Sequence, residues 1–446
     1  MTEFPRIIIF GQPFNNFSGG GITLTNLFKG WPKEKIAVTY MGHGLINITT
    51  DVCDKYYQLG NEEHKWKFPL NLIQRKFHSG IKTVELNKEV QINSFQKGLR
   101  YKLVNKYFYP FLRWTGIFYL SKTISISERF AEWLSEFRPE ILYLQVAAHE
   151  EVVFTNVLIN HLKIPVVIHM MDDWPTAISE KGLFKKYWSK KINKEFRSLL
   201  DNIDLYFSIS DAMTNEYSKR YNKYFIPFHN PIDIDLWSPY TKKDHTINNN
   251  HIEILYSGRI GDNGVVESIM EVAAAIDYMN DKGNKIKLHI QTPTQREDIL
   301  GRLRKYKCIV FNPFVGYNQI PVIFSRADIL LLANDFSMHG VKYLKYSMPT
   351  KASEYMISGT PVLVYSSGLT AISKFFSDNE CGCCITIQNR EEIIKAINYL
   401  VDNEDYRKKI SLNAVSLAKE RFEANKVRNE FQSLIINLAK KKKNVH

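Results

Sequence analysis

The chain has 446 residues, of which 44% are hydrophobic and 24% are charged. This length is more than one hydrophobic core usually supports and fits two domains of about 200 residues each, and the composition excludes a disordered chain. The start, MTEFPRIIIFGQPF, lacks the basic region and the small-residue cleavage site of a secretory signal, and the apolar runs are shorter than the ~20 residues that span a bilayer. We therefore expect a cytoplasmic protein.

Much of the net charge of +13 lies in one segment, residues 64–127. Twelve Lys or Arg residues stand there against two Glu residues, among many Phe, Tyr, Trp and Leu side chains. A cationic, aromatic-rich surface favours peripheral docking at the inner, anionic face of a membrane, or binding of a polyprenyl-linked acceptor. Nucleic acid is not expected, because no nucleic-acid-reading module is recognisable. The other interpretation is a solvated pair of basic helices whose aromatic residues lie in the core.

Five cysteines bear on metal binding. Three of them, Cys381, Cys383 and Cys384, crowd into ECGCCITI, but a zinc site needs a second pair of ligands at a comparable spacing. We expect these small side chains to enter a buried strand, and we expect no bound metal.

Short apolar runs bounded by turn residues alternate with helix-length amphipathic stretches along the whole chain, which predicts an α/β fold. The runs lack strict polar–apolar alternation, as is typical of parallel strands that are buried on both faces. In the first half the predicted strands are 6–10, 35–41, 140–146, 165–171, 204–210 and 223–228, and the predicted helices include 126–137 and 152–163.

The pattern stops in the polar, Asn-rich stretch 238–250 and then restarts. In the second half the predicted strands are 251–258, 285–292, 308–315, 327–334, 360–367 and 383–388, and the predicted helices are 266–283, the residues leading to 359, 390–403 and the whole stretch from 406 to 440. We therefore place an N-terminal domain at 1–240, a C-terminal domain at 251–425, and a final helix with a basic tail at 426–446. Two doubly wound parallel sheets that face each other would enclose a central cleft at the carboxyl ends of their strands, where such folds bind ligands.

A glycine-rich loop follows the first predicted strand. Gly19, Gly20 and Gly21 precede the predicted helix ITLTNLF, so backbone amides and the positive end of the helix dipole can receive an anion there. The loop has neither the Lys-Ser/Thr pair of a Walker loop nor the GxGxxG spacing. A flexible surface loop is the alternative interpretation.

A second glycine turn, YSGRIGDNG (256–264), follows the first strand of the second half. Gly258 allows a turn there, and Arg259 at the end of the strand can clamp a diphosphate with its guanidinium group. The alternative is an ordinary arginine in a solvated loop.

The segment YLKYSMPTKASEYMISGTPVLVY (343–365) predicts a short helix before a buried strand. Pro349 suits the first turn of this helix, Ser347 or Thr350 can cap it, and Gly359 can end it.

Two charged residues of this helix, Lys351 and Glu354, are three residues apart and therefore share one face. Lys351 and the amides at the start of the helix, next to Thr350, can meet phosphate oxygens. Glu354 can accept hydrogen bonds from two ribose hydroxyls. The alternative is an exposed Lys–Glu pair that contributes only a few tenths of a kcal/mol, about 0.2–0.5.

The run PTKASEYMISGTPVLV closely resembles the donor segment of family-4-type (group 1) GT-B glycosyltransferases, in which Pro-Ser/Thr-Lys-x-x-Glu-Tyr leads through a Gly into a buried strand. The segments HNPIDIDLWSP (229–239), SGRIGDNG and SGGG resemble three further elements of this family, in family order, and only residues 50–125 have no counterpart. The resemblance implies two Rossmann-like domains, with the nucleotide-sugar donor in the C-terminal one and the acceptor in the N-terminal one. It also implies diphosphate binding by Arg259, ribose binding by Glu354, no obligatory metal, and retention at the anomeric carbon.

Three positions depart from the family pattern. The Lys that usually follows the Gly-Arg pair is absent, and Asn263 stands nearest to its position. The first of the family's two glutamates is replaced by Tyr346, and the second His of a His-x-His run aligns with Gln145. We therefore expect Lys351 to supply the second cation.

Catalytic candidates follow two predicted strands of the first domain. His149 comes after 140–146, and Asp172 and Asp173 come after 165–171. A carboxylate or an imidazole at such a place can orient an acceptor hydroxyl or stabilise a cationic, sugar-like transition state. Alternatively, one of the two aspartates caps the next helix.

These features predict a glycosyltransferase that needs no cofactor. It would move a sugar from a UDP- or GDP-linked donor to a saccharide, or a lipid-linked saccharide, of a surface polysaccharide or glycolipid. One alternative is a nucleotide-sugar epimerase of the same shape, although its carboxylate-rich site is not recognisable. Another is a catalytically silent GT-B subunit that binds a partner or a membrane, which the three departures suggest.

Overall fold

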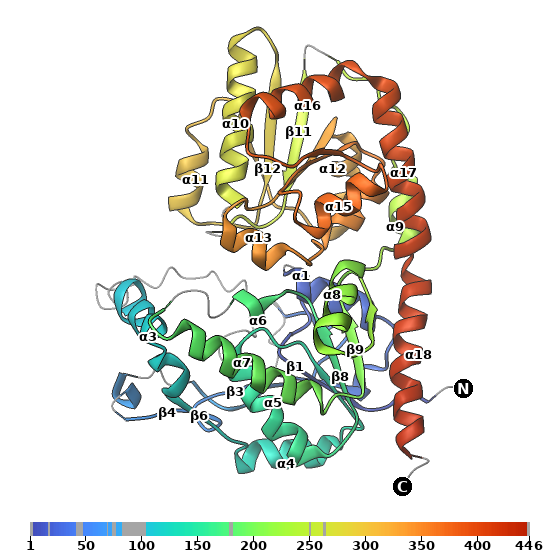
Figure 1. Ribbon diagram of the computed structural model, residues 1–446. Coiled ribbons are helices and arrows are strands. Elements are labelled where there is room, and N and C mark those ends of the chain that lie inside the picture. Colours follow the sequence, from blue (N-terminus) through green and yellow to red (C-terminus); the bar gives the residue numbers. More distant parts are fainter. Residues whose placement is uncertain are drawn as a thin grey trace. The chain divides into compact units, whose positions relative to one another are not determined.

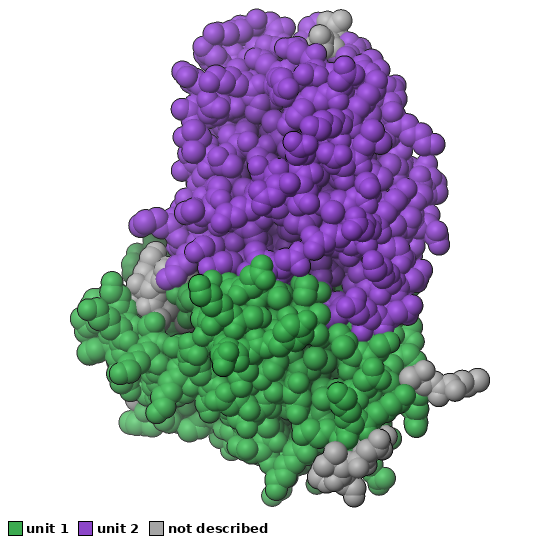
Figure 2. Space-filling view, turned by 45° about the vertical axis from the view of Figure 1, so that its right-hand side comes forward, with its two compact units in different colours: residues 1–208, 214–227, 431–446 green, residues 209–213, 228–430 purple. Residues whose placement is uncertain are grey.

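A computed structural model describes residues 3–16, 18–41, 48–68, 70–73, 77–82, 104–177, 182–248, 251–261 and 265–443. It divides into two compact units, unit 1 with residues 1–208, 214–227 and 431–446, and unit 2 with residues 209–213 and 228–430. Figure 1 traces the elements of both units, and Figure 2 colours the units separately. Asn263 and six of the twelve cations of segment 64–127 lie outside the described residues.

Unit 1 is built on one sheet with the strand order β10-β9-β8-β7-β1-β2-β3-β5, in which only β5 is antiparallel to its neighbour. The strands are β1 (Ile7–Phe10), β2 (Ile36–Met41), β3 (Tyr56–Leu59), β5 (Gly80–Lys82), β7 (Ile141–Leu144), β8 (Val166–Met170), β9 (Leu205–Ser208) and β10 (Phe225–Pro227). All six strands predicted in this half are confirmed. The edge strands β3 and β5, and a separate antiparallel pair of β4 (His64–Trp66) with β6 (Lys122–Ile124), were not predicted.

Helices cover both faces of this sheet. They are α1 (Gly19–Phe28), α3 (Tyr109–Thr115), α4 (Glu128–Phe137), α5 (His149–Leu162), α6 (Trp174–Ala177), α7 (Lys185–Leu200), α8 (Asp211–Tyr221) and α18 (Ala424–Lys443). On one face Phe28 of α1 and Phe431 of α18 meet with ring centroids 5.2 Å apart. On the other face Phe154 of α5 packs on Phe10 of β1 at 5.3 Å. The parallel strands are therefore buried on both sides, as their unbroken apolar runs predict.

Helix α1 begins at Gly19, so the prediction that the three glycines precede the helix is wrong. Ser18 caps the helix by accepting a hydrogen bond from the Gly21 amide (3.2 Å). A Cβ atom on Gly21 would lie 2.3 Å from the side chain of Asn15. The glycines therefore let the first turn of the helix pack closely against the preceding loop, which the sequence pattern does not reveal.

Unit 2 contains a six-stranded parallel sheet in the order β13-β12-β11-β14-β15-β16. Its strands are β11 (Ile252–Ser257), β12 (Ile286–Gln291), β13 (Ile309–Asn312), β14 (Ile329–Ala333), β15 (Val362–Tyr365) and β16 (Cys383–Ile385), which confirms all six predicted strands. The helices are α9 (Ile234–Trp237), α10 (Val265–Asp281), α11 (Glu297–Leu303), α12 (Ile320–Arg326), α13 (Met338–Leu344), α14 (Lys351–Ile357), α15 (Ala371–Asp378), α16 (Arg390–Asp402) and α17 (Glu404–Phe422).

The two faces of this sheet belong to two different hydrophobic cores. In β14, Ile329 and Leu331 enter one core with residues of α10 and α16, whereas Leu330 and Leu332 enter the other with residues of α14 and α17. Successive side chains of a strand point to opposite faces, so every residue of β14 is buried.

The cysteines of β16 and the carboxyl-terminal helices complete unit 2. Cys383 is buried, which raises the pKa of its thiol to about 11, as expected for a small apolar side chain.

The stretch predicted as helical throughout is interrupted at Glu423, where a parallel bridge to Ile232 separates α17 from α18. Within the described ranges no helix is both long and apolar enough to cross a bilayer.

Gly359 ends α14, as predicted, in the left-handed conformation with φ of +73°. A Cβ atom there would lie 2.9 Å from the carbonyl oxygen of Lys242. We expect Gly359→Ala to lower the free energy of unfolding by about 1–3 kcal/mol because of this strain. Gly301→Ala, within α11 and with open space around it, should instead raise it by up to about 1 kcal/mol. Urea denaturation midpoints that move in the same direction would contradict this reading.

Candidate functional site

The carboxyl end of β11 is the place in unit 2 where a ligand is expected. Strand β11 pairs with β12 on one side and with β14 on the other. The chain adds strands on the β12 side first and then on the β14 side, so the strand order reverses at β11. Gly258 follows the strand with φ of +147°, and its amide donates to the carbonyl of Gln291 (2.9 Å). A Cβ atom on Gly258 would lie 3.3 Å from Nζ of Lys351. The glycine therefore leaves room for this lysine beside the turn.

Lys351, the first residue of α14, reaches into this turn. Its Nζ donates to the carbonyl of Ser257 (3.3 Å) and lies 4.0 Å from the ring centroid of Tyr256. Burial lowers the pKa of Lys351 to about 7, against the opposing effect of the Glu354 carboxylate. An anion placed in this turn would raise that pKa again, so the lysine is poised to take up charge with its ligand.

Glu354 lies one turn further along α14 and is only 8% exposed. Burial raises the pKa of its carboxyl group to about 7, and the hydroxyl of Tyr317 in the short helix η6 (Tyr317–Gln319) and the charge of Lys351 oppose this shift. Its Oε1 atom has no hydrogen-bond partner in the part of the chain that the structure describes. A buried acceptor without a partner costs free energy, and a ligand hydroxyl would satisfy it.

The helix α14 is held in place by groups other than the predicted caps. Thr350 has helical backbone angles and makes no capping bond through its side chain, so the prediction that Thr350 caps the helix is wrong. Ser347 donates to the carbonyl of Tyr343 (3.4 Å). Instead, Ser353 Oγ donates to the carbonyl of Asn230 (3.1 Å), and Asn230 Nδ2 donates to the carbonyl of Thr350 (3.4 Å). The segment HNPIDIDLWSP thus positions the start of α14.

The structure gathers the predicted residues of unit 2 around one turn. Gly258 and Lys351 are in close approach, Glu354 is coupled to Lys351, and the exposed Arg259 follows Gly258, its carbonyl bound by the hydroxyl of Tyr256 (3.0 Å). Sequence reasoning missed Tyr256 and Tyr317. They occupy the end of β11 and the loop after β13, and a search for polar side chains at the ends of all predicted strands would have found them.

In unit 1 the corresponding reversal lies between β1 and β7. Gly11 follows β1 with φ of +97°, and a Cβ atom there would lie 2.0 Å from the carbonyl oxygen of Gln145. Gln145 is buried and its Nε2 atom has no partner among the described residues. Gly20 approaches the same glutamine, because its Cβ would lie 3.5 Å from Gln145 Oε1. Gly20, the middle one of the three predicted glycines, therefore borders a buried amide that has no partner for its Nε2 atom among the described residues.

His149 is the first residue of α5 and is buried against aromatic rings. Its Nε2 atom hydrogen-bonds Oε2 of Glu195 on α7, and the rings of Tyr119 and Trp188 pack around it at 5.5 and 6.3 Å. Two residues later, Glu151 accepts from the Ala147 amide (2.6 Å), and burial raises its pKa to about 7. Sequence reasoning missed both glutamates. Glu151 is a carboxyl group that can exchange a proton near neutral pH.

Asp173 is committed to the packing of unit 1. Its carboxylate is 2% exposed and accepts hydrogen bonds from Tyr217, from Arg220 and from Thr176 (each at 2.8–2.9 Å). Asp172, directly before it, is half-buried after the end of β8. The catalytic roles of His149, Asp172 and Asp173 stay predictions.

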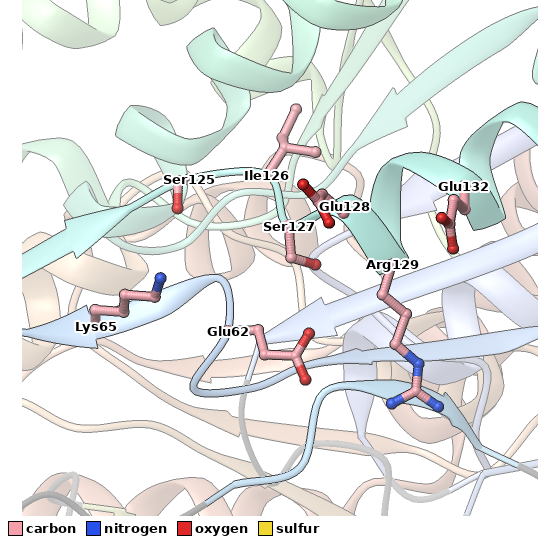
Figure 3. Close-up of a pocket in the computed structure, with 8 residues that line it drawn as sticks. All are labelled: Glu62, Lys65, Ser125, Ile126, Ser127, Glu128, Arg129 and Glu132. Carbon is pink, nitrogen blue, oxygen red and sulfur yellow. The ribbon is translucent and has the colours of Figure 1, made fainter.

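A hollow of about 440 Å³ lies elsewhere in unit 1, between the turn before β4 and the start of α4. Figure 3 shows its lining residues, Glu62, Lys65, Ser125, Ile126, Ser127, Glu128, Arg129 and Glu132. Three carboxylates stand there against two cations, so the hollow does not offer the chemistry of an anion site. Among the described residues no cluster of three His, Cys, Asp or Glu side chains is arranged to hold a metal ion.

Comparisons with known proteins agree with this geometry. Residues 239–416, which contain the turn and α14, match the family model "Glycosyl transferases group 1". No match is found among curated protein sequences.

Several solved structures share the fold over almost the whole chain. They include HepE of Anabaena in complex with UDP and glucose (TM-score 0.60, 12% identity, 97% of this chain and 99% of that one). Sucrose-phosphate synthase of Thermosynechococcus elongatus has a TM-score of 0.62 at 13% identity, with coverage of 97% and 98%. WaaG, a glycosyltransferase involved in lipopolysaccharide biosynthesis, has a TM-score of 0.55 at 12% identity, with coverage of 95% and 99%.

The structural role of Asp173 can be tested with its partner. Asp173→Ala should lower the free energy of unfolding by about 3 kcal/mol, because it leaves the largely buried Arg220 guanidinium without its carboxylate. The double variant Asp173→Ala/Arg220→Ala should lose less than the sum of the two single losses. Strict additivity in chemical denaturation would show that the pair does not interact.

Proposed function

We propose that this chain, a glycosyltransferase whose residues 239–416 form a group 1 domain, transfers a sugar from a UDP-linked donor to a saccharide acceptor. The chain has the GT-B fold. The observation that carries the proposal is the glycine turn at Gly258 with a buried, partly neutralised lysine and a buried carboxylate, one oxygen of which has no hydrogen-bond partner among the described residues. UDP is put before GDP because HepE, which shares the fold, binds UDP and UDP-glucose.

Each part of the turn matches one part of a nucleoside diphosphate. Lys351 and Arg259 would meet the diphosphate, whose negative charge grows when the sugar leaves. The Oε1 atom of Glu354, which has no partner among the residues that the structure describes, would accept a hydrogen bond from the ribose diol. Two cations supply the charge stabilisation that a divalent metal gives in other transferases, so we propose metal-independent transfer. Retention at the anomeric carbon is part of the same proposal and rests on the family resemblance.

The acceptor is assigned to unit 1. Gln145, His149 and Glu151 lie at or just beyond the carboxyl end of β7, where a doubly wound sheet binds its ligand. Glu151, with a pKa of about 7, could accept the proton of the acceptor hydroxyl as transfer proceeds. We propose that the acceptor is a saccharide, free or polyprenyl-linked, and that the enzyme builds a surface polysaccharide or glycolipid at the cytoplasmic face of a membrane.

Nucleotide binding tests the donor site directly. UDP should raise the melting temperature, and isothermal titration should show it binding more tightly than GDP. Lys351→Ala and Glu354→Ala should each weaken UDP binding about 10- to 100-fold, because each removes a charge-assisted hydrogen bond. Lys374→Ala, an exposed lysine of α15, is the matched control and should bind UDP normally. Equal affinity in all three variants would remove the basis of the proposal.

The pH dependence of UDP binding tests the buried lysine. In the free protein the pKa of Lys351 is about 7, so between pH 7.5 and 8.5 the lysine is mostly neutral and must take up a proton when the diphosphate binds. The affinity should therefore fall up to about tenfold per pH unit in this range. Lys351→Arg stays protonated and should flatten the profile. A wild-type affinity that is constant across this range would contradict the assignment.

A further inference from the structure

Exposed apolar side chains gather on two segments of unit 1 that are distant in the sequence. On α3, Phe111 and Trp114 are 55% and 50% exposed, and their rings stack at 6.5 Å. Around the start of α7, Leu183, Phe184 and Tyr187 are each more than half exposed. Single exposed apolar residues are ordinary on a protein surface, but a joined group of aromatic ones marks an interaction site.

The two segments form one continuous surface. The amide of Leu183 donates to the carbonyl of Trp114 (2.7 Å), and Trp114, Phe184 and Trp188 line the same small depression. Gly116, which ends α3, lies so close to Trp188 that a Cβ atom would be 1.9 Å from its indole nitrogen. Figure 1 shows α3 beside the first turns of α7. We call residues 104–122 together with 182–194 the α3–α7 surface.

The charge of the α3–α7 surface has one sign. It contains eight Lys or Arg residues and no Asp or Glu: Lys106, Arg113, Lys122, Lys185, Lys186, Lys190, Lys191 and Lys194. On α7, Tyr187, Lys190 and Lys194 recur at helical spacing, opposite the buried Trp188 and Ile192. Two of these cations pair with carboxylates just outside the two segments, Lys122 with Glu150 and Lys191 with Glu195. The remaining cations flank the exposed aromatic rings.

We propose that the α3–α7 surface docks on an anionic lipid bilayer and so brings unit 1 to a membrane-borne acceptor. This inference rests on the proposed function, because it names the carrier of the acceptor saccharide. Aromatic rings enter the interfacial layer of a bilayer while lysines bind its anionic headgroups, and the two contributions add. A nucleic acid would use the cations but would leave three exposed apolar side chains of 182–187 in water. A protein partner would need acidic and apolar groups that match this surface, and nothing on the surface indicates the shape of such a partner.

The position of the surface in the fold supports the coupling to the acceptor. Trp188 and Tyr119 belong to the two segments, their ring centroids lie 4.7 Å apart, and both rings pack on His149. A docked bilayer would therefore lie on the outer side of the aromatic layer whose inner side holds the predicted acceptor residue. The sequence prediction placed the membrane contact within 64–127, and the structure adds residues 182–194 to it.

Vesicle sedimentation tests the proposal with the full chain. Wild-type protein should bind vesicles of phosphatidylcholine with 30% phosphatidylglycerol at low salt, bind pure phosphatidylcholine at least about tenfold more weakly, and lose most of its binding at high salt. Phe111→Ser/Trp114→Ser/Phe184→Ser should reduce binding at every salt concentration. Lys186→Glu/Lys190→Glu should abolish the dependence on anionic lipid.

Matched controls lie in unit 2 and change the same kinds of residues. Ile387→Ser/Tyr399→Ser/Leu412→Ser removes three exposed apolar side chains, and Lys285→Glu/Lys305→Glu makes the same change in charge. Both controls should sediment like the wild type. Equal binding to neutral vesicles, unchanged binding of the α3–α7 variants, or binding of short RNA in place of vesicles would each overturn the proposal. All variants should keep normal UDP binding, so that a failure of docking is distinguishable from a failure of the donor site.

Discussion

Burial of both faces of a parallel sheet is the constraint on which the rest of this molecule depends. In β14 every side chain enters one of two cores, and β1, β7, β8 and β15 are buried throughout in the same way. Strands of this kind have almost no room for reactive side chains along their length. Polar groups are therefore displaced to the turns that follow the strands, and the glycines at positions 11 and 258 allow those turns to come close to their neighbours.

The turn after β11 shows what this arrangement does to charged groups. Lys351 and Glu354 are held in a protein environment that disfavours either charge, so burial moves their pKa values toward each other. The ring of Tyr256 and the carbonyl of Ser257 attract the lysine but do not neutralise it. A buried pair of this kind generally contributes little to stability. It is suited to a ligand that brings negative charge for the lysine and hydroxyl groups for the glutamate.

Some buried polar residues of unit 1 stabilise its packing, and others keep groups that can interact with a ligand. The carboxylate of Asp173 accepts hydrogen bonds from Arg220, Tyr217 and Thr176, and these bonds link α6 to α8. Gln145 keeps a buried amide hydrogen-bond donor without a partner in the described residues, and Glu151 keeps a carboxyl group that titrates near pH 7. The rings of Tyr119 and Trp188, which cover His149, line one depression together with the exposed Trp114 and Phe184, so the proposed acceptor region adjoins the proposed membrane contact.

The sequence by itself determined the parallel strands and most of the helices, because burial on both faces leaves long apolar runs whose limits are marked by turn residues. It also brought Gly258, Arg259, Lys351 and Glu354 into one hypothesis, because these residues keep a recognisable spacing. Only the tertiary structure decided that one oxygen of Glu354 has no partner among the described residues, that Asp173 is already hydrogen-bonded, that α1 starts within its glycines, and that residues 182–194 contact α3. Those facts depend on contacts between segments far apart in the chain, such as Asp173 with Arg220 or Leu183 with Trp114, and local periodicity and propensity carry no information about such contacts.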